Sequence, residues 1–420
     1  MKTMRVFLLV LAAALLVAGC GGDEKSKETG SAKKAPTADA KTAKGNVNWC
    51  IGKDTSGAYG AAIDLLKKEN PDLKVKLVEL PESADEQRTQ LVQRLKAKSA
   101  ECDVVGMDVI WTAEFAAQGW LQDVSDLVGK REQEFIPSTL ETTKYEDKNW
   151  AVPFHTNAGF LYYRTDQAGA KAPASWEEVY KKGEQEKGVV YQGARYEGLT
   201  VHFLELLYSA GGKALSDDGK TVEVDSEQGQ QVLKFMADGY KSGAVPKAVT
   251  TYQEEPARRA FETDKASFMR NWPYAYALGN KSKIKGKFDI APFPKFGSGE
   301  PASVLGGLNL AVSAYSENPK GAAAFINFAT GPEVQKDNFP LTPVATTAPY
   351  DDNAMRKDVP FAADLKKAVE QGQARPASPV YPQISESIYK NVHDALQGKQ
   401  APDAALKKMK TEMEKALQTF

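Results

Sequence analysis

The stretch from Cys102 to Trp120, C-D-V-V-G-M-D-V-I-W-T-A-E-F-A-A-Q-G-W, decides the fold. It begins with the short apolar run Val104–Val105, which is typical of a strand that is buried on both faces. Asp108 stands where this strand is expected to end. The segment 110–118 then carries apolar residues at helical spacing, and Gly119 follows as a helix stop. The pattern predicts a β-strand that leads directly into an α-helix.

The position of Asp108 predicts a ligand contact. In open α/β sheets, ligands bind beyond the carboxyl ends of the strands, beside the helices that follow them. A carboxylate there accepts hydrogen bonds from sugar hydroxyls, and Trp111 is close enough in sequence to stack on a sugar ring. The alternative is that Asp108 only caps the helix, because Asp is a favoured N-cap residue.

The length and composition limit the class of protein. A chain of 420 residues is too long for one hydrophobic core, so we expect two domains or one large two-lobed fold. A net charge of -1 argues against a nucleic-acid partner, which usually needs a basic surface. The three histidines and three cysteines lack metal-site spacing, and no nucleotide-binding or hydrolase motif is present. We therefore expect no metal and no other cofactor.

The first 20 residues have the pattern of a targeting segment. Lys2 and Arg5 precede an apolar run over 6–19, which is shorter than the roughly 20 residues that span a bilayer. The run ends in V-A-G-C, which resembles a bacterial lipobox, in which Cys20 is lipidated and becomes the N-terminus. An ordinary signal peptide or an uncleaved anchor is the alternative. Acyl chains such as palmitate on Cys20 would hold the protein on the extracytoplasmic side of the cell membrane.

Residues 21–45 contain almost no large apolar side chain, which predicts a flexible linker. If Cys20 is acylated, Cys50 and Cys102 remain, and disulfides persist in exported proteins. Both cysteines lie in expected neighbouring strands, so we predict a structural Cys50–Cys102 disulfide. Two buried thiols are the alternative.

Strand and helix patterns alternate between residues 46 and 127. This β-α-β-α-β order predicts a parallel sheet with right-handed crossovers. Lys53 and Asp54 follow the first strand and share its carboxyl edge with Asp108, and Arg88 lies near the start of the second helix. Each of these three charges is either a ligand contact or a solvated loop charge. The expected strands are 47–51, 74–80 and the one that Cys102 opens, and the expected helices are 58–69 and 85–98.

The segment 150–164 has the pattern of an extended crossing that ends in an aromatic strand. Pro153 suits a hinge, and Asn157 offers a ligand both hydrogen-bond donors and acceptors. Residues 175–300 are mostly helical in pattern. They include an unusual polar and aromatic loop over 192–200.

Two later junctions carry further candidates. Trp272 and Tyr274 lie where a strand leads into a helix, which favours a ligand contact for Trp272 and leaves contact and core packing nearly balanced for Tyr274. The pair Gly306 and Gly307 would let the backbone approach a ligand closely, or would only form a tight turn. Arg375 lies in a loop and is a candidate clamp over a cleft.

Taken together, these segments resemble the extracellular solute-binding proteins (family 1) of ABC sugar importers, in the group of trehalose- and maltose-binding lipoproteins. The resemblance rests on the Cys20 lipobox, D-V-V-G-M-D-V-I-W-T-A-E-F-A-A-Q-G-W, V-P-F-H-T-N-A-G-F-L-Y-Y-R, A-R-Y-E-G-L, N-W-P-Y-A-Y and L-G-G-L-N-L-A-V-S. It implies an α/β, two-lobe periplasmic-binding-protein fold of class II type, with discontinuous lobes, a hinge and the ligand in the cleft. The implied lobes are 46–152 plus 303–345 and 153–302 plus 346–420.

The resemblance also implies a function. The protein would capture a sugar, a disaccharide such as trehalose or maltose, and deliver it to the transmembrane subunits of a permease, as a monomer without catalytic activity. The implied ligand contacts are Asp108, Asn157, Trp272, Gly306, Gly307 and Arg375, followed by Glu197, Tyr196, Asp54, Arg88 and Tyr274. Relatives often have an acid in place of Asn157, and some have an aromatic residue in place of Leu308, so the sugar can differ.

Two other functions remain as alternatives. A binding protein for another solute, such as a polyol or another oligosaccharide, would share the same fold. An exported glycosidase would need two carboxylates that flank one glycosidic bond, and Asp108 and Glu197 are the only pair to nominate.

Overall fold

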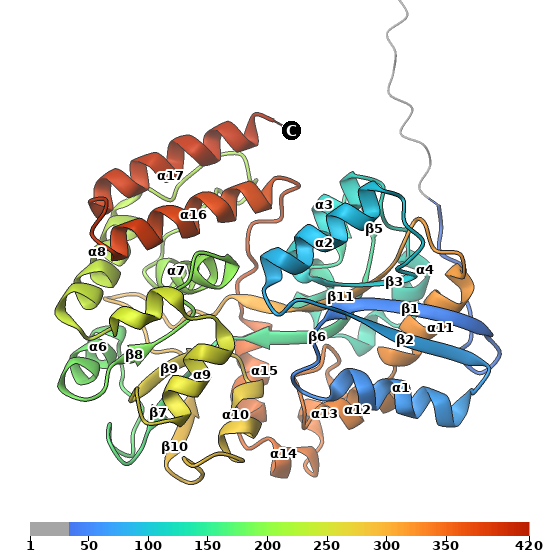
Figure 1. Ribbon diagram of the computed structural model, residues 1–420, viewed down its shortest axis with the longest axis horizontal. Helices are drawn as coiled ribbons and strands as arrows, with labels where there is room; N and C mark the ends of the chain where they lie inside the picture. The colour runs from blue at the N-terminus through green and yellow to red at the C-terminus, as the bar shows by residue number, and fades with distance from the viewer. Residues whose placement is uncertain (1–32, 420) are drawn as a thin grey trace, which may run out of the picture. The chain divides into compact units, whose positions relative to one another are not determined.

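The computed structural model describes residues 33–419 (Figure 1). Its first sheet has five strands in the order β2-β1-β3-β11-β6. β1 runs parallel to β2 and β3, whereas β11 lies antiparallel to both β3 and β6. The strands are β1 (Gly45–Gly52), β2 (Leu73–Leu80), β3 (Val104–Asp108), β6 (Val152–Ala158) and β11 (Leu305–Val312).

A second sheet forms the centre of the other lobe, with strands in the order β10-β7-β9-β8. These strands are β7 (Phe160–Arg164), β8 (Val189–Val190), β9 (Phe268–Asn271) and β10 (Phe288–Ala291). A short two-stranded sheet joins β4 (Lys144–Tyr145) and β5 (Lys148–Asn149). The protein therefore has the two-lobe α/β fold that the resemblance implies.

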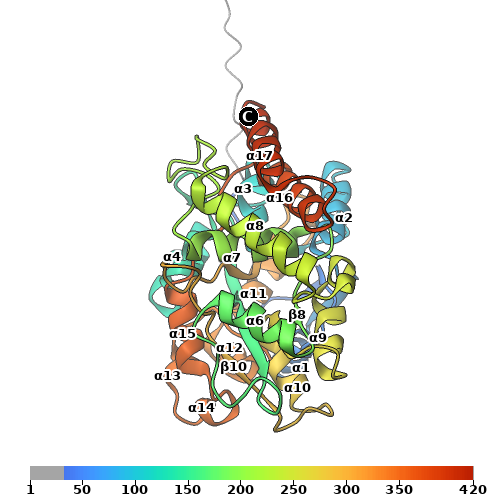
Figure 2. The same ribbon diagram turned by 90° about the vertical axis from the view of Figure 1, so that its left-hand side faces the viewer.

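Helices connect and cover the strands. α16 and α17 pack against each other and against α7 and α8, as the side view in Figure 2 shows. No helix among residues 33–419 is both long and apolar enough to cross a membrane. The helices up to β6 are α1 (Ala58–Glu69), α2 (Ala84–Lys96), η1 (Val109–Trp111), α3 (Thr112–Ala117), α4 (Ser125–Gly129), η2 (Glu132–Glu134) and α5 (Pro137–Glu141). Those between β7 and β10 are α6 (Trp176–Gln185), α7 (Glu197–Ser209), α8 (Glu227–Ser242), η3 (Lys247–Thr251), α9 (Glu254–Glu262) and α10 (Tyr274–Gly279). After β11 come α11 (Pro319–Ala329), α12 (Pro332–Asn338), α13 (Ala348–Asp351), α14 (Met355–Asp358), α15 (Ala362–Glu370), α16 (Tyr381–Leu396) and α17 (Pro402–Leu417).

The β-α-β-α-β order expected for residues 46–127 is confirmed. The helix expected over 58–69 has those bounds, because Asn70 and Pro71 end the apolar periodicity there. The single helix expected over 110–118 is divided into the 3-10 turn η1 and the short helix α3. Gly119 ends α3 with a φ of 69°, a left-handed conformation that glycine adopts without strain.

The chain passes between the sheets at Gly159, after β6 and before β7. β6 pairs with β11 as far as Ala158, so residues 153–158 belong to the first sheet, and the lobe boundary expected after residue 152 lies later. The Gly159 N–H donates to Ser303 Oγ at 2.8 Å, and the Gln373 N–H donates to the Ser303 carbonyl at 2.9 Å. Three chain segments therefore meet at Ser303. The other lobe boundaries stay predictions.

The prediction of a flexible linker over 21–45 is wrong for 33–45, the part that the structure describes. Ala35, Ala40 and Ala43 are buried in the core of the first lobe. The Asn70 amide donates to the carbonyl of Ala43 at 2.8 Å. Small methyl groups and backbone bonds hold this segment, so the lack of large apolar residues did not signal disorder. The targeting segment, Cys20 and residues 21–32 lie outside the described residues.

The disulfide joins Cys50 of β1 to Cys102, which precedes β3, with a Cα–Cα distance of 5.5 Å. Both residues are buried. The bond closes a loop across 52 positions of the chain. Loops of this size lose substantial chain entropy when cross-linked, which stabilises the folded state.

We expect the Cys50→Ser/Cys102→Ser variant to lose about 2–4 kcal/mol of unfolding free energy, because the unfolded chain gains conformational freedom. Urea denaturation measures the loss. Reduction of the wild-type protein should lower its stability by a similar amount and leave the double variant unchanged. Equal stability of wild type and variant under oxidising conditions would contradict this account.

Candidate functional site

A polar cleft lies where the carboxyl end of β3 faces the N-terminus of α7. Both lobes and the crossing segments contribute to its walls. The nine sequence candidates that line this cleft are Asp108, Asn157, Tyr196, Glu197, Trp272, Tyr274, Gly306, Gly307 and Arg375.

Arg375 lines this cleft and bonds two carboxylates. Its Nη2 lies 2.7 Å from Asp108 Oδ1, and its Nη1 lies 2.7 Å from Glu197 Oε1. Tyr381 donates its hydroxyl to the same Glu197 oxygen at 2.7 Å, and Ser385 donates to the other oxygen. The guanidinium therefore links the end of β3 to the start of α7.

Asp108 has one of the two roles that the sequence left open, the helix cap, and it also lines the cleft. Its Oδ1 accepts the Ile110 N–H at 3.2 Å, which caps η1, and also the Arg375 guanidinium. Its side chain keeps 19% of its surface exposed, whereas that of Arg375 keeps 2%. Because a carboxylate has several acceptor positions, Asp108 can cap the helical turn and still face the cleft.

Burial raises the pKa of Glu197 to about 7, the charge on Arg375 opposes this rise, and the charge on Asp108 adds to it. Near neutral pH the cluster therefore holds a proton that an exposed glutamate would have lost. His155, which also lines the cleft, is buried, and burial lowers its pKa to about 3. Its imidazole is consequently neutral at physiological pH.

The glycine pair brings the β11 backbone against Trp272. A Cβ on Gly306 would lie 3.0 Å from Cη2 of the indole. Gly307 has a φ of 126°, and a Cβ there would lie 2.3 Å from the His155 carbonyl oxygen. Gly307 therefore requires glycine, whereas a Cβ on Gly306 would fit only if the indole of Trp272 moved slightly. Asn157 pairs with Gly306 across β6 and β11, which places its amide in the same wall.

A second hydroxyl and carboxylate group lies on the side of the second lobe. Tyr196 donates its hydroxyl to Glu254 Oε2 at 2.7 Å, and Tyr274 donates to Glu255 Oε1 at 2.9 Å. Burial raises the pKa of Glu254, against the Tyr196 hydrogen bond, which lowers it. Sequence reasoning missed Glu254 because no motif or junction marks it.

Other lining residues were also missed, although a signal existed for some of them. Thr55 and Ser56 lie in the loop after β1, where Lys53 and Asp54 had been noted as neighbours of the strand edge. The remaining missed residues are Tyr59, Glu82, Ala84, His155, Gly198, Val201 and Thr342, whereas Leu308, which also lines the cleft, was noted as a departure from relatives.

Two of the predicted ligand contacts, Asp54 and Arg88, are not among the residues that line this cleft, and their ligand contacts stay predictions. The Asp54 carboxylate accepts the N–H groups of Gly57 and Tyr59, at 2.7 Å and 2.9 Å, and thereby satisfies the start of α1. Arg88 forms a two-point ion pair with Glu114, in which Nε lies 2.7 Å from Oε2. Each charge already has an internal partner.

Asp85, which lies near Arg88 on α2, contacts the other lobe. Asp85 Oδ2 of α2 accepts the backbone N–H of Glu197, the first residue of α7, at 3.1 Å. This bond adds a second link between the two walls of the cleft. Because the bond satisfies an N–H at a helix N-terminus, the carboxylate and the helix dipole attract each other.

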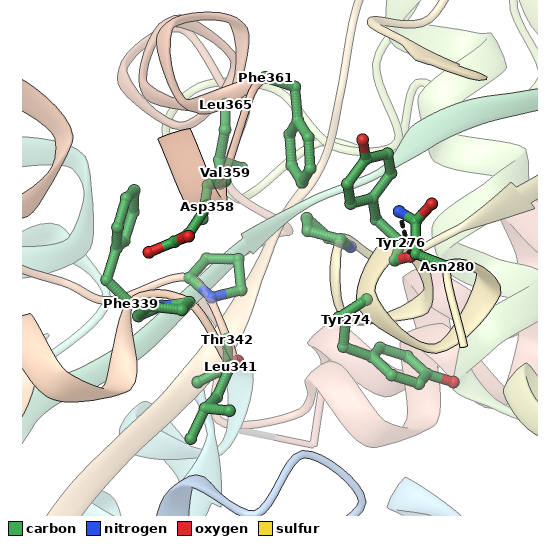
Figure 3. A pocket seen from close by; sticks show the side chains of 14 residues that line it. Tyr274, Tyr276, Asn280, Phe339, Leu341, Thr342, Asp358, Val359, Phe361 and Leu365 are labelled. Carbon is green, nitrogen blue, oxygen red and sulfur yellow. Dashed lines mark hydrogen bonds between the residues drawn. The ribbon is translucent and has the colours of Figure 1, made fainter. Parts of the chain in front are cut away.

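A separate cavity lies between α10, the segment 339–343 and α15 (Figure 3). It shares Tyr274 and Thr342 with the cleft, but its walls are mostly apolar, and Phe339, Val359 and Phe361 are prominent among them. The polar cleft is therefore the better candidate for a ligand with many hydroxyl groups. Among residues 33–419, no group of three or more metal-ligating side chains is suitably placed for a metal ion.

The raised pKa of Glu197 predicts a pH dependence of stability. Between its unfolded pKa of 4.5 and its folded pKa of about 7, the folded protein holds a proton that the unfolded chain releases. Stability from this group is therefore full below pH 4.5 and is lost as pH rises to 7, by the order of 1–3 kcal/mol. The stability of wild type minus that of Glu197→Gln should fall across this range, as denaturation at several pH values would measure.

Glu178→Gln is a matched control, because hydrogen bonds from the Ala174 N–H and Lys182 lower the pKa of Glu178. The stability of wild type minus that of Glu178→Gln should not fall between pH 5 and 7. Other groups with a raised pKa, such as Asp85, are present in wild type and in each variant, so their contributions to the stability difference cancel. A constant difference for Glu197→Gln would contradict the assignment.

The chain is similar to proteins of known class. A probable ABC transporter-binding protein of Deinococcus radiodurans is 36% identical over 363 residues, which cover 81% of this chain and 86% of that protein. A mannitol-binding protein of Pseudomonas aeruginosa is 24% identical over 63% of this chain and 64% of that protein. The solved structure of maltose-bound T. maritima MalE3 has 34% identity and a TM-score of 0.83, covering 88% of this chain and 99% of that chain.

The family model described as bacterial extracellular solute-binding protein matches residues 52–336. This range begins at the last residue of β1 and includes β2, β3, the crossing at Gly159, the sheet of the second lobe and β11. The resemblance seen in the sequence is thus confirmed at the level of family and fold. The chain belongs to the bacterial extracellular solute-binding proteins.

Proposed function

We propose that this protein captures a disaccharide such as trehalose or maltose in the cleft and delivers it to the membrane permease of an ABC transporter. The observation that carries the proposal is that the Asp108–Arg375–Glu197 cluster and Trp272 line the same cleft, which is walled by both lobes. The family supports an extracytoplasmic binding role. The sugar itself is part of the proposal.

The chemistry of the lining suits a sugar. A disaccharide has many hydroxyl groups and apolar ring faces. Asp108, Arg375 and Glu254 can make charge-assisted hydrogen bonds to hydroxyls, which are stronger than bonds between neutral groups. The half-buried indole of Trp272 can cover the C–H face of a sugar ring. Such a site discriminates against a sugar that lacks one hydroxyl, because its own polar groups then stay unpaired.

The placement of these groups supports hinge closure. Asp108 lies on the first sheet, Glu197 lies on α7 of the other lobe, and Arg375 bonds both. A ligand that contacts both walls favours the closed conformation only by the difference in its affinity for the two conformations. The closed form would then be recognised by the permease.

The sugar could differ from the disaccharides that we favour. Maltose-bound MalE3 supports maltose, whereas the mannitol-binding relative supports a polyol as the alternative. Asn157 in place of an acid and Leu308 in place of an aromatic residue would alter which hydroxyls and ring faces are satisfied. We further propose that the protein is monomeric and is anchored through lipidated Cys20.

We expect one disaccharide in a panel of trehalose, maltose, sucrose, glucose, maltotriose and polyols to raise the melting temperature of the protein. Ligand at a hundred times its Kd stabilises by ~2.7 kcal/mol, which moves the melting temperature by several degrees. Asp108→Asn and Trp272→Ala should each weaken binding by roughly 10- to 100-fold, because each removes one class of contact. Thermal shift and calorimetry measure these effects.

Asp64→Asn, the same chemical change at an exposed position on α1, should leave the affinity unchanged. Stabilisation by a polyol alone would favour the alternative solute. If no carbohydrate or polyol shifts the melting temperature, the sugar proposal is wrong. Release of glucose from trehalose or maltose would instead indicate a glycosidase, for which Glu197 has the raised pKa of a general acid.

A further inference from the structure

A fully buried ion pair lies behind Trp272 in the second lobe. Arg270 of β9 and Glu205 of α7 both have side chains with 0% exposure. Arg270 Nε lies 2.9 Å from Glu205 Oε2, and a second bond joins Nη2 to Oε1. Gln192 completes the arrangement, since its Oε1 accepts Arg270 Nη1 at 3.0 Å. Burying two charges carries a large desolvation penalty, so stability alone does not explain the pair.

The guanidinium of this pair lies directly against the indole. The Cζ atom of Arg270 is 3.9 Å from the centroid of the Trp272 ring, which is well within cation–π range. The backbone of Trp272 is also fixed, because Tyr162 donates its hydroxyl to the Trp272 carbonyl at 2.8 Å. The edge of the ring meets Gly306. Arg270 therefore covers one side of the ring, and the ring lines the cleft.

The carboxylate of the pair abuts the crossing between the lobes. A Cβ on Gly159 would lie 2.4 Å from Glu205 Oε1, so the residue at the crossing has to be glycine for the carboxylate to fit. Gly159 is in turn hydrogen-bonded to Ser303. Gly159, Glu205, Arg270 and Trp272 thus form one contiguous line of contacts from the crossing to the cleft.

We propose that Glu205 and Arg270 are positioning residues of the sugar site, which hold the Trp272 ring in one orientation relative to the crossing between the lobes. Neither residue lines the cleft, so each acts through Trp272. The two-point bond to Glu205 fixes the plane of the guanidinium, and that plane fixes the ring. A ring that is already oriented loses less freedom when a sugar binds. The inference rests on the proposed function, because it takes Trp272 as a sugar contact.

The test compares Arg270→Lys, Arg270→Met and Glu205→Leu/Arg270→Met with wild type. The double variant replaces the ion pair by apolar side chains, which usually preserves folding even where a single change does not. Two quantities are measured for each variant: the emission of Trp272 without ligand, and the Kd for maltose and trehalose. Subtracting the spectrum of the same variant with Trp272→Phe isolates Trp272 from the other five tryptophans.

We expect the double variant to shift the emission of Trp272 and to weaken binding roughly tenfold, because a ring without this support loses more rotational freedom when the sugar binds. Arg270→Lys keeps the cation but loses the planar fork, so its Kd should fall between those of wild type and Arg270→Met. Arg164→Met is the control, because it breaks another ion pair of the second lobe, between Arg164 and Asp166 at 2.7 Å. It should lower stability without changing Kd or the emission of Trp272.

Wild-type emission and wild-type affinity in the folded double variant would overturn the proposal. A stability loss in that variant with unchanged Kd would overturn it as well, since the pair would then only hold the lobe together. If wild type binds neither sugar, the proposed function fails instead. In that case the emission of Trp272 without ligand still shows whether the Glu205–Arg270 pair orients the Trp272 ring.

Discussion

The guanidinium of Arg375 bonds the carboxylates of Asp108 and Glu197, each at 2.7 Å, and the two lobes meet through this contact. Asp108 comes from the end of a parallel strand, Glu197 from the first turn of α7, and Arg375 from the segment that runs beside Ser303. A buried carboxylate pair without the cation between it would repel, and a lone buried guanidinium would lack partners. The arrangement of the cleft therefore depends on all three side chains.

The pairing of buried charged and polar side chains also occurs behind the cleft. Arg270 and Glu205 are buried as a pair, and Tyr196 and Glu254 share a hydrogen bond in the wall of the cleft. In both groups the buried polar side chains have partners that come from different elements. Apolar packing then surrounds these groups, with Trp176 and Phe293 among the buried aromatic residues of the second lobe. Such a site is preorganised, which suits a receptor that must recognise many hydroxyls at once.

Local patterns predicted the elements well where the deciding forces were local. The helix 58–69 and the strand before Asp108 follow from apolar spacing and from nearby Asn, Pro and Gly residues. Asp54 and Arg88, in contrast, do not line the cleft, and the physical reason is the same for both. Both charges lie near the correct edge of the sheet, but free N–H groups of α1 and the carboxylate of Glu114 satisfy them first. Composition also misled for 33–45, where small alanines pack as well as larger residues would.

The sequence by itself determined the alternation of strands and helices, the family, and the junctions at which Asp108, Trp272 and the glycine pair lie. Those features depend on the spacing of residue types over short stretches, so local interactions are sufficient to form them. Only the tertiary structure decided which charges face the cleft, that Glu254 and His155 join its wall, and that Arg270 supports Trp272 from behind. A charged side chain pairs with the partner that is closest in space. Which partner is closest is determined only when segments that are distant in the sequence pack together.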